Sequence, residues 1–90
     1  MNVLIVEDDR KLNASLCEVL ETYGASCTGC TNGADGFANG LNGEWDIILL
    51  DIMLPEMDGF EITRRLRTHG VSTPILMLTA RSDTEDRIIG

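Results

Sequence analysis

The stretch Asp46-Ile47-Ile48-Leu49-Leu50-Asp51 decides the fold of this chain. Four consecutive large apolar residues, bounded by two aspartates, predict a short strand that is covered on both faces. Strands of this kind occur in parallel sheets, which carry helices on both of their faces. The chain is therefore predicted to form an α/β domain around a parallel sheet.

Further strands and helices are predicted on both sides of this stretch. Apolar or small residues predict strands at 3–6, 25–31 and 74–79, and helical spacing of apolar residues predicts helices over 12–23, 33–41 and 59–68. Ser82 and Glu85 have the spacing of a capping box, which would open a fourth helix. Strands that alternate with helices form a three-layer sandwich with right-handed crossovers.

The helices are expected to bury their apolar positions against the sheet. The second predicted helix follows the N-cap residue Asn32 and is rich in glycine, which makes it the weakest of the set. The third follows the N-cap residue Asp58. The positions expected to face the sheet are Ala34, Phe37, Ala38 and Leu41 in the second helix and Phe60, Ile62 and Leu66 in the third.

The chain is acidic, with 15 Asp and Glu residues against 7 Lys and Arg residues and a formal net charge of -8. Such a surface repels nucleic acid phosphates, so direct contact of this segment with DNA or RNA is not expected. That the charge only aids solubility is an open alternative. No apolar run is long enough to span a membrane. Three cysteines, an odd number, and the lack of a signal-peptide pattern predict a cytoplasmic location.

Acidic residues follow two of the predicted strands. Glu7, Asp8 and Asp9 come directly after the first strand, and Asp51 ends the third. In open parallel sheets, ligands bind beyond the carboxyl ends of the strands, so neighbouring strands would bring these groups into one pocket. Such a cluster suits Mg²⁺, which takes a few carboxylates together with waters and phosphate oxygens. The plainer alternative is a solvated turn with a helix cap.

Asp51 could act as a nucleophile. A carboxylate at the end of a central strand is held rigidly and can attack phosphorus to give an aspartyl phosphate. The hydroxyl of Thr79, at the end of the fourth predicted strand, could bond the phosphoryl group. Taken singly, Asp51 is also compatible with an ordinary loop residue and Thr79 with a good strand former.

Three segments resemble the hallmark stretches of receiver domains of two-component response regulators. They are VLIVEDD at 3–9, DIILLDIMLPEMDG at 46–59 and PILMLTAR at 74–81. The resemblance covers the whole chain and implies a flavodoxin-like fold with the strand order 2-1-3-4. It also implies a signalling phosphoacceptor, not an enzyme, with a sensor histidine kinase as partner. Glu7 and the sequence Thr-Ala-Arg at 79–81 are similar to regulators with winged-helix DNA-binding output domains.

The resemblance implies a role for each matching residue. Asp51 would be the phosphorylated aspartate. Asp8 and Asp51 would bind Mg²⁺ together with the backbone carbonyl of Met53, and Glu7 would act in the second shell or through a water.

Two residues after the fourth predicted strand also match the family. Thr79 resembles the switch hydroxyl, and Ala80 the small residue that leaves room for the phosphate.

The match departs from the family pattern at its end. The family has a fifth strand and a lysine after it, whereas the only lysine here is Lys11, at the start of the first predicted helix. We therefore expect residues 1–90 to be a receiver domain truncated within its fourth helix, with four strands instead of five. The fourth strand would then be a bare edge, which invites self-association or domain swapping.

Two alternative functions are considered. A fragment that cannot switch could serve as an interaction or oligomerisation module. A phosphohydrolase on a similar fold would need a second aspartate at the position of Met53. A redox or metal pair at Cys27 and Cys30 is not expected, because strand residues three apart face opposite sides of a sheet.

Overall fold

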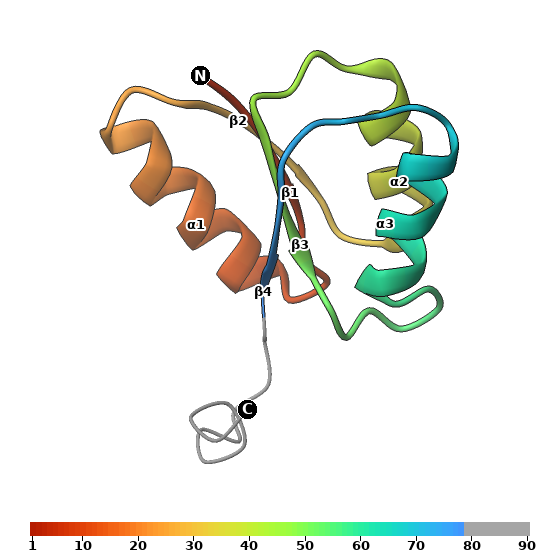
Figure 1. Cartoon of the computed structure of the whole chain (residues 1–90). Coiled ribbons are helices and arrows are strands. Elements are labelled where there is room, and N and C mark those ends of the chain that lie inside the picture. The colour runs from red at the N-terminus through yellow and green to blue at the C-terminus, as the bar shows by residue number, and fades with distance from the viewer. Residues whose placement is uncertain (79–90) are drawn as a thin grey trace, which may run out of the picture.

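A computed structural model describes residues 1–78 of the chain. Strands and helices alternate along the whole of this range (Figure 1). The elements are β1 (Asn2–Val6), α1 (Arg10–Thr22), β2 (Ser26–Cys30), α2 (Gly33–Asn42), β3 (Ile47–Asp51), α3 (Gly59–Thr68) and β4 (Ile75–Leu78). The predicted helix that opens at Ser82 lies outside the described residues.

The four described strands form one parallel sheet in the order β2-β1-β3-β4. Helix α1 covers one face of the sheet, and α2 and α3 cover the other (Figure 1). The predicted α/β class, the three layers and the order 2-1-3-4 are thus confirmed. The chain crosses from the β1–β2 side to the β3–β4 side of the sheet, and this reversal places the ends of β1 and β3 side by side.

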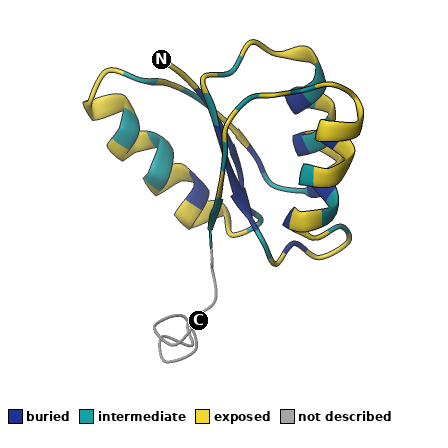
Figure 2. Ribbon diagram, viewed as in Figure 1, coloured by how far each residue is buried: buried dark blue, intermediate teal, exposed yellow. Residues whose placement is uncertain are grey.

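The core consists of two layers of apolar side chains, one on each face of the sheet. Because strand side chains alternate between faces, Val3 and Ile5 pack with Leu49 toward α1, whereas Leu4 and Val6 pack toward α2 and α3. Figure 2 shows the buried residues concentrated along the central strands. Burial of each such Leu or Ile side chain contributes about 1.5–3 kcal/mol, so β1 and β3 form a rigid base for the residues that follow them.

Helix α2 faces the sheet with its glycines, which corrects the expected face. Gly33, Gly36 and Gly40 are buried, whereas Ala34 and Ala38 are exposed; Phe37 and Leu41 are partly buried as expected. The cause is close packing, since a Cβ at Gly36 would lie 2.6 Å from Cγ1 of Val6. The glycines therefore bring α2 close to β1.

The buried stripe of α3 also differs from the expected one. Ile62 and Leu66 are buried as predicted, but Phe60 is 58% exposed, so its predicted burial is wrong. The inward stripe runs through Gly59, Ile62 and Leu66 at helical spacing, and Phe60 lies about 100° around the helix from Gly59.

Side-chain caps begin all three described helices. Asp9, Asn32 and Asp58 each accept a hydrogen bond from the backbone N–H three residues later, at 3.1, 2.8 and 2.8 Å. The predicted N-cap roles of Asn32 and Asp58 are confirmed. Each cap lies between the carboxyl end of a strand and the helix that follows it. The caps therefore fix where each helix begins at this edge of the sheet.

Candidate metal centre

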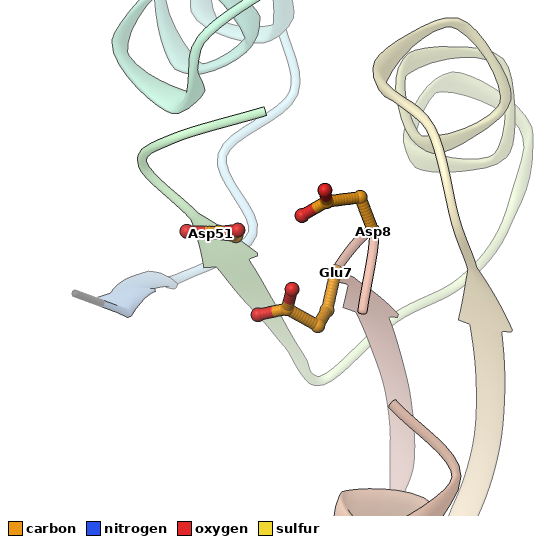
Figure 3. A group of neighbouring side chains, drawn as sticks. All are labelled: Glu7, Asp8 and Asp51. Atoms are coloured by element: carbon orange, nitrogen blue, oxygen red, sulfur yellow. The ribbon is translucent and has the colours of Figure 1, made fainter. Parts of the chain in front are cut away.

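The carboxylates of Glu7, Asp8 and Asp51 meet at the carboxyl ends of β1 and β3. Val6 is paired in register with Leu50, so Glu7 and Asp51 stand at the same level of the sheet. One oxygen of each carboxylate lies within 4.8 Å of the others (Figure 3). The expected convergence is therefore found for these three residues. Asp9 is not part of the cluster, because its side chain caps α1.

Two of the three carboxylates are fully buried. Glu7 and Asp51 are both 0% exposed. The Asp9 N–H donates to Glu7 Oε2 at 2.9 Å, and the Met53 N–H donates to Asp51 Oδ1 at 3.0 Å. The buried oxygens Glu7 Oε1 and Asp8 Oδ1 accept no hydrogen bond from the described residues. Buried polar oxygens without partners are costly, so these two atoms indicate a site for a ligand with positive charge.

The electrostatics of the cluster indicate the same ligand. The pKa of Glu7 is raised from an ordinary 4.5 to about 7. Burial is the largest cause of this higher pKa, the hydrogen bond from the Asp9 N–H opposes it, and the charges of Asp51 and Asp8 add to it. Burial also raises the pKa of Asp51, and Asp8 adds to this effect. Like charges this close oppose each other's ionisation, and a bound cation would relieve the conflict.

The donor set fits a small divalent cation. Mg²⁺ prefers oxygen ligands and takes one or two carboxylates while keeping several waters. Glu7, Asp8 and Asp51 supply only carboxylate oxygens, and no His or Cys belongs to the cluster. A softer metal such as Zn²⁺, which favours nitrogen and sulfur ligands, suits this set less well.

Two residues that support the pocket were missed from the sequence. A Cβ at Gly59 would lie 2.7 Å from the Asp51 carbonyl oxygen, so only glycine allows α3 to start this close to β3. Asn13 is buried in α1 and donates to the carbonyls of Glu7 and Cys30 at 3.0 and 2.9 Å. The spacing could have predicted the burial of Asn13, because this residue lies three positions before Leu16 on the inward stripe of the helix.

For the other predicted site residues, the structure shows only part of what was expected or does not describe them. Thr79 and Ala80 lie outside the described residues. Met53 donates its backbone N–H to Asp51, and the role of its carbonyl stays a prediction. Cys27 and Cys30 pack in the cores on opposite faces of the sheet, as expected for strand residues three apart.

Comparison with known proteins identifies the family. The family model for the response regulator receiver domain matches residues 3–90. This chain belongs to that family. Receiver domains are signalling modules of two-component systems; they generally hold Mg²⁺ at an acidic pocket and interact with sensor histidine kinases. In this receiver, the carboxylates of Glu7, Asp8 and Asp51 form an acidic cluster.

Curated relatives of this receiver include transcriptional regulators. It is 42% identical over 90 residues to the transcriptional regulatory protein TcrA of Mycobacterium tuberculosis, covering all of this chain and 36% of the relative. It is 40% identical over 90 residues to the transcriptional regulatory protein CusR of Escherichia coli, covering 100% of this chain and 40% of the relative. The receiver thus spans well under half the length of these proteins.

Solved receiver structures have the same fold. The receiver domain of the Francisella response regulator 1452 matches with a TM-score of 0.84 and 28% identity, over 98% of this chain and 73% of that one. Chemotaxis protein CheY4 of Vibrio cholerae matches with a TM-score of 0.78 and 28% identity, over 97% and 74% of the two chains. Within the described part of the receiver, no helix has the length and apolar character needed to cross a membrane.

Proposed function

We propose that this receiver accepts a phosphoryl group on Asp51 from a sensor histidine kinase in a Mg²⁺-dependent reaction. The observation that carries the proposal is the placement of Asp51. It ends the central strand β3, is fully buried, and lies within 4.8 Å of two further carboxylates. The match of the family model to residues 3–90 supports the same role.

The transfer is a displacement at phosphorus. A carboxylate oxygen of Asp51 forms the new O–P bond while the P–N bond of the donor phosphohistidine breaks, and the imidazole leaves with the electron pair. The Met53 N–H orients the Asp51 carboxylate through its bond to Oδ1. A rigid, oriented nucleophile lowers the entropic part of the barrier.

The acidic cluster would hold the cation that this chemistry needs. We assign Asp8 and Asp51 as direct ligands with the backbone carbonyl of Met53, and Glu7 as a second-shell group or a ligand through water. Bound Mg²⁺ supplies positive charge to the oxygens of the transferring phosphoryl group. Thr79 is proposed to bond the phosphoryl group, and Ala80 to leave space for it.

The test is phosphorylation by acetyl phosphate, followed by intact mass spectrometry. The chain should gain one labile phosphoryl group in the presence of Mg²⁺, and EDTA or Asp51→Asn should abolish the gain. Asp58→Asn is the matched control, because asparagine also caps helices and Asp58 lies outside the cluster. A folded chain that gains no phosphoryl group, or an adduct that persists in Asp51→Asn, would refute the assignment.

We further propose that phosphorylation controls a DNA-binding output segment of the winged-helix type, in the cytoplasm. The curated relatives are named transcriptional regulatory proteins, and they are more than twice as long as this chain. With a net charge of -8, the receiver itself should not bind DNA. Fluorescence anisotropy should detect no binding of the 90-residue chain to duplex DNA at about 0.15 M salt. Tight binding would contradict the proposal that only the output segment contacts DNA.

A second candidate function is self-association through β4. This strand lies at one end of the described sheet, and Leu76 on it is 54% exposed. Exposed apolar edge strands pair with other chains, and lysine on an edge strand discourages such pairing. Sedimentation velocity should show a dimer that Leu76→Lys converts to a monomer. A wild-type chain that stays monomeric at all concentrations would rule this function out.

A further inference from the structure

A buried asparagine on α1 joins the ends of two strands next to the acidic cluster. Asn13 is only 6% exposed, and its Nδ2 donates to the Glu7 carbonyl at 3.0 Å and to the Cys30 carbonyl at 2.9 Å. The Glu7 N–H also donates to the Cys30 carbonyl at 3.0 Å. The amide of Asn13 thus uses both of its hydrogens to link the chain just after β1 to the end of β2.

The orientation of this amide is determined by its surroundings. Both atoms near Nδ2 are carbonyl oxygens, which only accept hydrogen bonds, so reversing the amide would create two repulsive oxygen contacts. The Cys17 thiol donates to Oδ1 at 3.8 Å. Oδ1 also lies directly over Gly29 of β2, where a Cβ would overlap it. Asn13 therefore has one orientation in which all of its polar atoms have partners.

The Glu7 carbonyl belongs to the peptide group that connects Glu7 to Asp8. Holding this peptide group sets the direction in which the Asp8 side chain leaves the backbone. The neighbouring turn is tied back by the Asp9 N–H, which donates to Glu7 Oε2. Because Asn13 holds the Glu7 carbonyl and the Asp9 N–H holds the Glu7 carboxylate, the two carboxylates that follow β1 depend on the same short segment.

From this geometry we infer that Asn13 is a positioning residue for the acidic pocket, acting through the Glu7 backbone on the carboxylates of Glu7 and Asp8. Its effect on Mg²⁺ binding and phosphorylation rests on the proposed function. Its effect on the geometry of the Glu7–Asp9 turn does not. Residues that orient ligands in this way commonly change metal affinity by about 10–100-fold when substituted.

Gly29 offers a second way to disturb the same amide. In Gly29→Ala, the new Cβ meets the end of the Asn13 side chain, which is the part most easily displaced. Gly29→Ala should therefore reproduce the defect of Asn13→Ala, although it changes no hydrogen-bonding group. In the Asn13→Ala background, no side-chain oxygen remains to overlap, so Gly29→Ala should have little further effect. Such non-additivity is expected only if both substitutions act through the amide.

The experiment compares four chains: wild type, Asn13→Ala, Gly29→Ala and the double variant. Isothermal titration calorimetry should show an increase of about tenfold in the Kd for Mg²⁺ in each variant. In metal-free protein, the NMR resonances and hydrogen exchange of the Asp8 and Asp9 amides should change similarly in all three. Leu66→Ala, in the core on the α2–α3 side and away from the pocket, is the control for a general loss of stability.

The outcomes separate the inference from the proposed function. A wild-type chain that binds Mg²⁺ but takes no phosphoryl group would refute the proposed function and leave the Asn13 result standing. If the wild type binds no Mg²⁺, the Asp8 and Asp9 amide resonances in metal-free protein test the positioning role of Asn13 by themselves. Unchanged Asp8 and Asp9 amides in Asn13→Ala, equal changes in Leu66→Ala, or additive effects of the two substitutions would overturn the inference.

Discussion

Raising the pH from about 5 to about 8 in metal-free buffer should destabilise the receiver, chiefly through Glu7. The pKa of this carboxyl is raised from 4.5 to about 7, chiefly by burial and in smaller part by Asp51 and Asp8. Between these two values the folded chain binds more protons than the unfolded chain, so the free energy of unfolding falls as the pH rises. The contribution is fully present below about 4.5 and is lost as the pH passes through about 7.

The size of the effect follows from the same two values. A rise in pKa from 4.5 to about 7 corresponds to about 3 kcal/mol, at about 1.4 kcal/mol for each pH unit. A single domain has a free energy of unfolding of about 5–15 kcal/mol, so the loss would be a large share of it. Mg²⁺ should flatten the dependence, because bound cation favours the ionised carboxylates.

The assay is urea unfolding at several pH values in EDTA, for wild type and Glu7→Gln. Glutamine keeps an oxygen that can accept the Asp9 N–H but cannot ionise in this range. The free energy of unfolding should therefore depend less steeply on pH in Glu7→Gln, with a weaker slope left by Asp51, whose pKa is also raised. Parallel curves for the two proteins would refute the assignment of the effect to Glu7.

Three further predictions concern the scaffold. Gly36→Ala should destabilise the receiver by about 1–3 kcal/mol in urea unfolding, because its Cβ would lie 2.6 Å from a methyl group of Val6; an unchanged midpoint would mean that α2 can move away freely. Asp58→Ala should cost about 1 kcal/mol through loss of the N-cap, whereas Asp58→Asn should cost almost nothing. Because burial raises the pKa of both thiols, Cys27 and Cys30 should be alkylated slowly at pH 8. Peptide mapping after diamide treatment should show no bond between them, and a Cys27–Cys30 disulfide would contradict their placement on opposite faces.

The sequence by itself determined the class of fold and the place of the site. Runs of apolar residues such as Ile48–Leu50 predict doubly covered strands, and their alternation with helices leaves few topologies open. The carboxyl ends of parallel strands lie at one edge, so Glu7 and Asp51 could be assigned to one pocket before their distance was known. The N-cap at Asp58 was predictable for a different reason, because it depends only on residues three positions apart in the chain.

Only the tertiary structure decided the features that depend on contacts between distant segments. Phe60, Ala34 and Ala38 are exposed although they were expected to face the sheet. The approach of each helix to the sheet selects its buried stripe, and periodicity alone does not specify that approach. The two hydrogen bonds that Asn13 donates require an amide of α1 to reach the ends of two strands at once. The pKa of Glu7 likewise reflects desolvation by groups that are remote in sequence. Local patterns specify elements and their order, whereas packing distances specify which polar groups lose water and which partners they find.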